Sequence, residues 1–333
     1  MRSLSSWRGG WARVAAAPAT LLGVLAITLL TALPLALALR GDIDAHLGRS
    51  LMADRAADGV NWDWWQEFTS QATGVGATFT PSVIGFASTL DALSSVLDHQ
   101  REAMPIAAAI ATYLLAWLFL SGGIVDRYAR QRRTRAYGFF AASGTFFWRF
   151  LRLAVVGGLA YWFLYAYVHD YLFGVFYVRT TRDLDVERTA FLWRMGLYAI
   201  FIALLAVVNV VLDYAKIRIV VEDRRSVIGA LRASLAFIAR NPGSVIGLYA
   251  LNTLTFVVVV GIWALVAPGA GPGGPRIWIA VGVTQLYLVA RLAMKLQFIA
   301  SQTALFQSRL AHAAYTAAPQ PSWPESPVAE MIR

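Results

Sequence analysis

Long apolar runs alternate with polar and arginine-rich segments along this chain. Six of the runs have about 20 residues, the length that an α-helix needs to cross roughly 30 Å of hydrocarbon. They cover residues 15–39, 105–125, 153–173, 195–212, 244–267 and 277–297. The pattern predicts an all-α fold, namely a polytopic membrane protein with about six transmembrane helices in one membrane domain that comprises residues 1–333.

The composition agrees with a chain that is surrounded by lipid. Charged residues make up 14% of the sequence, hydrophobic residues make up 58%, and the mean hydropathy is +0.56. A soluble domain carries about 25% charged residues because its surface faces water. The absence of cysteine excludes disulfides, a thiolate nucleophile and a cysteine-type zinc site.

The positive charges lie on alternate connections between the runs. Of the 29 Lys and Arg residues, 20 lie before residue 15, in residues 126–152, in residues 213–243 or from Arg291 onwards. Connections rich in Lys and Arg stay in the cytoplasm. We therefore expect both termini in the cytoplasm and the connections 40–104 and 174–194 on the opposite side.

The first apolar run allows a second interpretation. Residues 1–38 could form a signal peptide that is cleaved after Ala36-Leu37-Ala38, which would leave five spans. The apolar region of a signal peptide usually has about 7–15 residues, and this run is longer. We therefore expect an uncleaved first span.

The two basic segments, 126–152 and 213–243, are too apolar for simple solvated loops. Aromatic residues alternate with arginines in residues 135–152, and residues 226–241 place apolar side chains at helical spacing before Pro242. Both segments are typical of amphipathic helices that lie in the cytoplasmic interface of the membrane. Such a helix could also serve as an elbow that reverses the direction of the chain.

The arginines of these segments are candidate contacts for anionic lipid headgroups, because the planar guanidinium fits phosphate. The candidates are Arg132, Arg133, Arg135, Arg149, Arg152, Arg224, Arg225 and Arg232. The segments also share a short pattern, since Ile124–Arg130 and Val211–Lys216 each place an Asp shortly before a Tyr-Ala pair and a basic residue at the end of a span. This similarity suggests a parallel internal repeat.

The connection 40–104 is the largest segment outside the predicted spans, and we expect it to be mostly helical. Apolar spacing predicts helices over residues 42–60 and 82–101. Between them, Trp62, Trp64 and Trp65 favour a position at the boundary of membrane and water, with a platform for carbohydrate or peptide as the alternative. The Pro-rich stretch 318–333 is predicted to be disordered.

Polar residues inside spans are functional candidates by default. The candidate polar cavity comprises Asn209, Asp213, Gln285, Arg291 and Lys295, from the spans 195–212 and 277–297 and their ends. Arg291 could instead snorkel to the surface, or form an ion pair with Asp213 or Asp126 that fixes the helix ends. Asn252 is a further amide within the span 244–267.

The sequence contains no recognisable catalytic or metal-binding motif, and we predict no cofactor. His169 and Asp170 are adjacent, but neighbours on a helix point about 100° apart, so neither can orient the other. Zinc-protease, nucleophile-elbow and P-loop motifs are absent, and the predicted all-α chain offers no strand-turn-helix unit for a dinucleotide-binding motif. We predict no nucleic-acid partner, because the excess arginines lie next to spans, as topology requires.

Five short motifs lie in the second basic segment and in the outer connection, namely Asp213–Lys216, Val221–Ser226, Ala233–Asn241, Val60–Phe68 and Thr78–Pro81. They resemble a group of uncharacterised bacterial six-helix membrane proteins, which is distantly similar to the membrane domain that precedes some glycerophosphodiester phosphodiesterases. The resemblance implies the cytoplasmic (inner) membrane of a bacterium. It implies no catalytic residue, since we expect no phosphodiesterase domain in the 36 residues after the last run.

Three functional hypotheses follow. The first is a non-enzymatic component that organises membrane lipids or a partner membrane protein. The second is a transporter of a small solute or lipid through the polar cavity between the fourth and sixth spans. The third is an intramembrane enzyme that uses His169 and Asp170.

The predicted topology is tested by fusing an alkaline phosphatase reporter, which is active only outside the cytoplasm, to successive connections. We expect inactive fusions within residues 126–152 and 213–243 and active fusions within residues 40–104 and 174–194. The opposite pattern would overturn the orientation.

Overall fold

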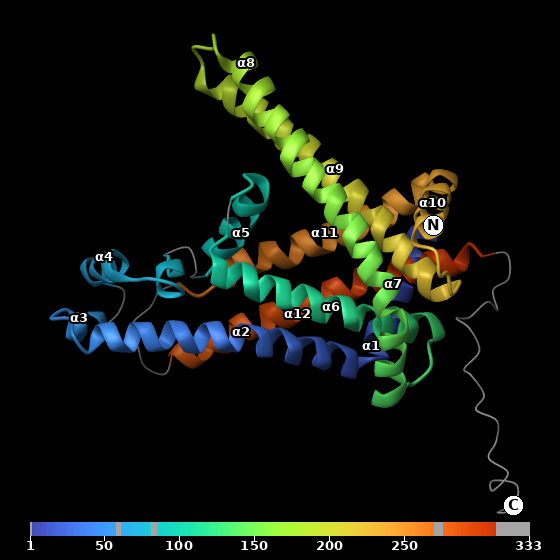
Figure 1. The fold of residues 1–333 in the computed structure, drawn as a ribbon, viewed down its shortest axis with the longest axis horizontal. Coiled ribbons are helices and arrows are strands. Elements are labelled where there is room, and N and C mark those ends of the chain that lie inside the picture. The colour runs from blue at the N-terminus through green and yellow to red at the C-terminus, as the bar shows by residue number, and fades with distance from the viewer. Residues whose placement is uncertain (1, 58–60, 81–84, 101, 270–275, 311–333) are drawn as a thin grey trace, which may run out of the picture.

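A computed structural model describes residues 2–57, 61–80, 85–100, 102–269 and 276–310. Within these ranges the chain is helical and contains no strand. Figure 1 shows its helices: α1 Arg2–Ala15, α2 Pro18–Leu47, α3 Ala53–Ala57, α4 Trp62–Gln71, η1 Gly76–Thr78, α5 Ala87–Leu97, α6 Met104–Arg130, α7 Ala136–Phe163, the π-helical η3 Leu164–Phe176, α8 Tyr177–Thr181, α9 Glu187–Val221, α10 Val227–Arg240, α11 Pro242–Val266 and α12 Arg276–Ser308.

Six helices in the described ranges are long and apolar enough to cross a membrane. They are α2, α6, the continuous rod 136–181 that α7, η3 and α8 form, α9, α11 and α12. The predicted all-α class with six spans is therefore confirmed, and the chain is a multi-pass membrane protein.

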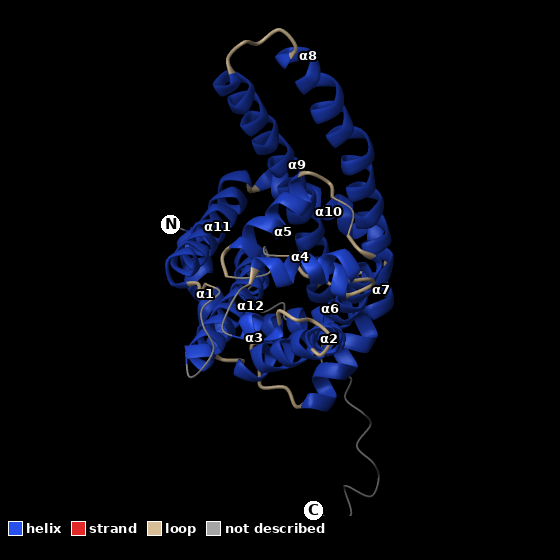
Figure 2. Cartoon of the chain, turned by 90° about the vertical axis from the view of Figure 1, so that its left-hand side faces the viewer, coloured by secondary structure: helices blue, strands red, loops and turns tan. Residues whose placement is uncertain are grey.

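Four of the spans run alongside one another, and the other two form a hairpin that leans away. Figure 1 shows α2, α6, α11 and α12 lying lengthwise, with α3 and α4 at one end. In Figure 2 the hairpin of α7, η3, α8 and α9 projects well beyond that bundle. We call the end that holds α1, α10 and the connection 131–135 the basic end, and the opposite end the outer-loop end.

The buried core lies at the basic end. The last two turns of α9, from Tyr214 to Val221, pack with α10 and with the ends of α6, α7, α11 and α12. The first half of α9 keeps Leu192, Ile200 and Ile202 exposed. Lipid can cover those side chains, so the hairpin is buried in the core at one end, and its other end leans away from the four-span bundle.

Small residues allow α6 and α7 to approach closely within this core. A Cβ atom at Gly123 would lie 2.6 Å from Ser143 Oγ and 2.8 Å from the carbonyl oxygen of Phe139. α6 cannot carry a side chain at Gly123 unless the two helices move apart. Such contacts are how helices associate in lipid, where burial of apolar surface gives no advantage.

The first predicted run, 15–39, differs from the helices that the structure shows. The chain forms α1 before the run, breaks at Ala16 and Ala17, and begins α2 at Pro18. The break has a local cause, since a residue that precedes proline is disfavoured in the helical region, while proline itself suits the first turn. The pattern of apolar runs does not predict α1, which packs mainly along α12 and α11.

Several other predicted boundaries also fall inside helices. The expected division between the basic segment 126–152 and the run 153–173 is absent, because α7 continues through it. The rod 136–181 has 46 residues and is about 69 Å long, more than twice the hydrocarbon thickness. Its first turns can therefore lie outside the hydrocarbon, as the amphipathic pattern predicts.

The second basic segment forms the expected separate helix. The Ser226 hydroxyl accepts a hydrogen bond from the backbone N–H of Gly229 and caps α10 at its start. Pro242 begins α11 directly after Asn241. The predicted spans 195–212 and 277–297 are extended at the basic end, because α9 continues to Val221 and α12 to Ser308.

The outer connection is mostly helical, but its helices are shorter than predicted. The helix expected over 42–60 is interrupted after Leu47, where α2 ends, and resumes as α3. Within the range 82–101, where one helix is predicted, the described residues form the shorter helix α5. His46 meets Phe68 edge-on with ring centres 5.4 Å apart, so α4 packs against the end of α2. The tail 318–333 lies outside the described residues.

Contact between α1 and α12 depends on Gly10. A Cβ atom there would lie 2.7 Å from Ser301 Cβ and 2.9 Å from Ser301 Cα. We expect Gly10→Ala to force α1 away from α12 and to lower the free energy of unfolding by about 1–3 kcal/mol. Thermal unfolding in mild detergent measures the effect.

Gly9→Ala is the matched control. Its Cβ would meet Ala304 Cβ at 3.8 Å, an ordinary contact, and alanine is the better helix former by up to about 1 kcal/mol. The Gly9 variant should therefore unfold no earlier than the wild type. Equal unfolding temperatures for the two variants would contradict the close packing of α1.

Candidate functional site

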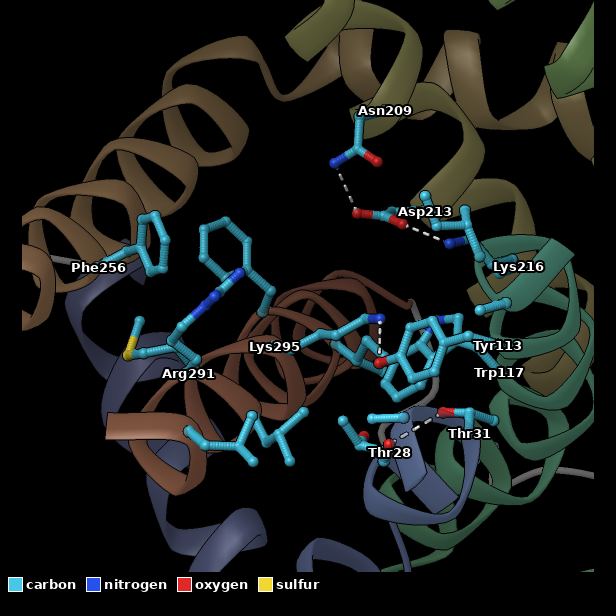
Figure 3. A pocket seen from close by; sticks show the side chains of 18 of the residues that line it. Thr28, Thr31, Tyr113, Trp117, Asn209, Asp213, Lys216, Phe256, Arg291 and Lys295 are labelled. Carbon is cyan, nitrogen blue, oxygen red and sulfur yellow. Dashed lines mark hydrogen bonds and ion pairs between the residues drawn. The ribbon is translucent and has the colours of Figure 1, made fainter. Parts of the chain in front are cut away.

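A cavity of about 780 Å³ lies between α2, α6, α9, α11 and α12. Figure 3 shows side chains from these helices pointing into a shared space. We call it the central cavity. Its volume is in the range of roughly 300–1,000 Å³ that is usual for small-molecule sites.

Two cations of α12 line the central cavity without a carboxylate partner among the described residues. Lys295 Nζ donates a hydrogen bond to the Tyr113 hydroxyl at 3.2 Å and lies 3.5 Å from the centre of the Trp117 ring. The Arg291 guanidinium lies 5.6 Å from the centre of the Tyr287 ring. Aromatic faces attract cations, but they leave both positive charges uncompensated.

The carboxylate of the cavity is already occupied by neighbouring groups. Asp213 lies 2.7 Å from Lys216 Nζ, and it accepts hydrogen bonds from Asn209 at 3.4 Å and Gln302 at 3.3 Å. Lys216 therefore neutralises Asp213. Arg291 and Lys295 remain, so the central cavity carries a net positive charge.

Helical spacing explains why these groups share one space. Tyr113 and Trp117 are one turn apart on α6, as are Asn209 and Asp213 on α9 and Arg291 and Lys295 on α12. Residues at such spacing lie on the same helix face. Each helix therefore contributes a short polar strip, and the strips meet inside the bundle (Figure 3).

Polarity changes along the length of the central cavity. Its α6 wall begins with Ile106, Ala109 and Ile110 near the outer-loop end and continues to Tyr113 and Trp117. Trp117 is the midpoint of α6. The cations are therefore held halfway along a span, with an apolar section toward the outer-loop end.

Four of the five predicted cavity residues line the central cavity, namely Asn209, Asp213, Arg291 and Lys295. The fifth, Gln285, is exposed and does not line it, because its position on α12 turns it to another face. Asn252 is buried elsewhere and donates to Ser301 Oγ at 2.8 Å.

The expected ion pairs of Arg291 do not form in the structure. Asp213 pairs with Lys216, and Asp126 pairs with Arg130 at 2.8 Å, one turn along the same helix. Each carboxylate has a basic residue of its own helix within reach, which leaves none for Arg291. The predicted pairs rested on charged residues that lie at a similar depth in the membrane. Depth alone does not reveal ion pairs that form within one helix.

Sequence reasoning missed Lys216, Tyr113 and Trp117. Lys216 follows Asp213 by three residues, a spacing that indicates an ion pair on one helix face. Tyr113 and Trp117 are large aromatic residues one turn apart in an otherwise aliphatic span. The sequence contains these spacings, but only the fold shows that Tyr113 and Trp117 face Lys295.

The predicted headgroup arginines fall into two groups. Two form ion pairs within the protein: Arg149 with Asp223 and Arg224 with Glu222. They stabilise the turn between α9 and α10, where Asp223 has a φ of 48°. The others are exposed at the basic end: Arg132, Arg133, Arg135, Arg152, Arg225 and Arg232.

His169 and Asp170 do not converge on a common site. His169 Nε2 lies 2.9 Å from the carbonyl oxygen of Leu97, whereas Asp170 is exposed. The imidazole therefore contributes to docking of the outer connection. This arrangement gives no support to a catalytic pair.

Helix α5 bridges the hairpin and α12 at the outer-loop side. At its end, Asp98 accepts hydrogen bonds from Tyr198 and from Arg194, the latter at 3.2 Å. Near its start, the hydroxyl groups of Thr89 and Tyr287 are 3.4 Å apart. The contacts connect the free part of the hairpin to the bundle.

No protein-family model, curated protein or solved structure matches this chain. The resemblance based on the five motifs therefore stays a prediction.

The contact at Asp98 predicts a dependence of stability on pH. The Tyr198 hydroxyl, assisted by Arg194, holds the pKa of the Asp98 carboxyl below its usual range. The stabilisation is therefore complete above the unfolded pKa of about 3.9 and is lost as the pH falls through the folded-state pKa. Asp98→Asn should cost on the order of 1 kcal/mol at pH 7.

Unfolding temperatures of the wild type and the variant between pH 7 and pH 3 test this contact. The difference in unfolding temperature between the two proteins should narrow toward the acidic end. Asp91→Asn, at an exposed position of the same helix, is the control and should match the wild type. A difference in unfolding temperature between the wild type and the Asp98 variant that does not change with pH would show that the charge of Asp98 does not stabilise the contact.

Proposed function

We propose that this membrane protein binds an anionic amphiphile in the central cavity and moves it through the membrane. The observation that carries the proposal is the pair of uncompensated cations, Arg291 and Lys295, at mid-span. Charge in the middle of a bilayer is costly and is usually associated with a substrate pathway. Binding sites near the midplane are also typical of transporters.

The chemistry of the lining supports an anion with an apolar part. The two cations attract a phosphate or carboxylate, and the fork of Arg291 suits either group. Ile106, Ile110 and Leu35 offer an apolar surface on the side of the outer-loop end. We therefore propose a lipid as substrate class, with both termini of the protein in the cytoplasm and the bacterial inner membrane as its location.

Translocation in proteoliposomes tests the proposal. Phosphatidylglycerol with a fluorophore on its headgroup is reconstituted with the protein, and a membrane-impermeant reductant bleaches the outer leaflet. Wild-type protein should expose the inner-leaflet probe to bleaching faster than empty liposomes do. Lys295→Gln should slow this phase about tenfold, the effect of a 1.4 kcal/mol loss of interaction.

Arg276→Gln provides the matched control, because it removes an exposed cation from the first turn of the same helix. It should leave the rate unchanged. A wild-type rate equal to that of empty liposomes, or a Lys295 variant as fast as the wild type, would contradict the proposal.

The second candidate function is a non-enzymatic component that organises lipid or a partner membrane protein. The six exposed arginines at the basic end favour it, because a basic interface attracts anionic headgroups. This role predicts that specific lipids or a partner copurify in mild detergent although the protein moves no probe in liposomes.

A further inference from the structure

A second cavity, separate from the central one, lies at the basic end. It has a volume of about 570 Å³ and is bounded by the junction of α1 and α2, by α6, and by the chain that enters α7. We call it the α2 groove. It shares no lining residue with the central cavity.

The α2 groove contains a buried cation without a counter-ion. The side chain of Arg127 lines it, and this residue is 8% exposed. Its Nη2 atom donates to the carbonyl oxygen of Ala16 at 2.9 Å, but no carboxylate of the described chain lies within ion-pair distance. A buried charge is costly unless it is paired, so an anion from outside the protein fits this position.

Other groups at the same end of the α2 groove favour an anion. Arg133 also lines it and has no ion pair among the described residues, and none of the described lining residues is Asp or Glu. α2 begins here at Pro18, so the positive end of a 30-residue helix adjoins the guanidinium groups. Thr20 and Thr134 belong to the same lining.

The remainder of the α2 groove is apolar. It continues along α2 to Ile27, nine residues from Pro18, and along α6 to Leu120, seven residues from Arg127, which corresponds to roughly 14 Å and 10 Å. Val24 and Phe140 complete this part. The charged end lies at the ends of two spans, where phosphates of a bilayer are found, and the apolar part lies at the depth of acyl chains.

We propose that the α2 groove binds one anionic phospholipid, with its phosphate on Arg127 and Arg133 and an acyl chain along Val24 and Leu120. Both the charge and the length of the groove match this occupant. The site is independent of the proposed transport, since it lies at the surface end of the spans.

Gly23→Phe tests the apolar part of the site. Gly23 lines the α2 groove and is exposed, and a Cβ there would have no atom within 4 Å. The aromatic ring can therefore fill the groove without disturbing α2. Gly158→Phe is the control, because that exposed position on α7 is equally open and lines neither cavity.

Arg133→Gln tests the charged part without touching the buried Arg127, whose loss could disturb the fold. Its control is Arg225→Gln, at another exposed arginine of the basic end.

The measurement is native mass spectrometry of delipidated full-length protein, titrated with phosphatidylglycerol or phosphatidylcholine. We expect one tight phosphatidylglycerol in the α2 groove on the wild type, on both controls and on Lys295→Gln. The proposed substrate site of the central cavity adds a second, weaker phosphatidylglycerol, which Lys295→Gln removes. Gly23→Phe should lose it, and Arg133→Gln should bind it about tenfold more weakly, with unchanged unfolding temperatures. Equal binding of both lipids, or wild-type binding by Gly23→Phe, would overturn the proposal, while the Lys295 variant separates this outcome from failure of the central cavity.

Discussion

The polar and close-packed contacts of α12 at the basic end are the interaction on which the rest of the structure depends. Lipid is as apolar as the spans, so burial of apolar surface does not hold them together. Association needs hydrogen bonds and close approach. Gln297 donates to the carbonyl oxygen of Trp7, Gln307 to that of Ala129, and Asn252 to Ser301, at 2.8 to 2.9 Å. These bonds connect α12 to α1, α6 and α11.

The same contacts explain why the spans separate toward the other end. The amide groups lie in the last turns of α12, and the buried part of α9 faces them, with Gln302 bonded to Asp213. The first half of α9, which precedes Asp213, has no comparable bonds to α12 among the described residues. There the hairpin leans away from the bundle (Figures 1 and 2). The central cavity lies next to this transition from packed to separated helices. A cavity at that level can change its width if the hairpin moves about the basic end.

The number and identity of the spans followed from the sequence because run length is a direct consequence of bilayer thickness. The helix ends did not, because α9 and α12 continue into an apolar core at the basic end, where packing replaces lipid. α1 was missed for a related reason. Gly9 and Gly10 weaken its helical pattern, yet the absence of a side chain at Gly10 is what allows α12 to approach.

The candidate site was only partly accessible from the sequence. Asn209, Asp213, Arg291 and Lys295 were recognised because polar groups in spans are rare. Gln285 met the same criterion but turns to another helix face, and one sequence does not determine which face looks inward. Tyr113 and Trp117 face Lys295 only because α6 and α12 are neighbours, which depends on the tertiary packing.

The distribution of charge connects the two cavities to one physical constraint. Asp126, Asp213 and Glu222 each pair with a basic residue no more than four positions away, so local spacing uses up the carboxylates near the spans. Basic residues exceed acidic ones in the chain, 29 against 19, so ion pairs cannot neutralise all of them. Four cations have no ion pair among the described residues and line one of the two cavities, namely Arg127, Arg133, Arg291 and Lys295. A membrane offers them phosphate as counter-ion, which is the reason for proposing an anionic lipid in both cavities.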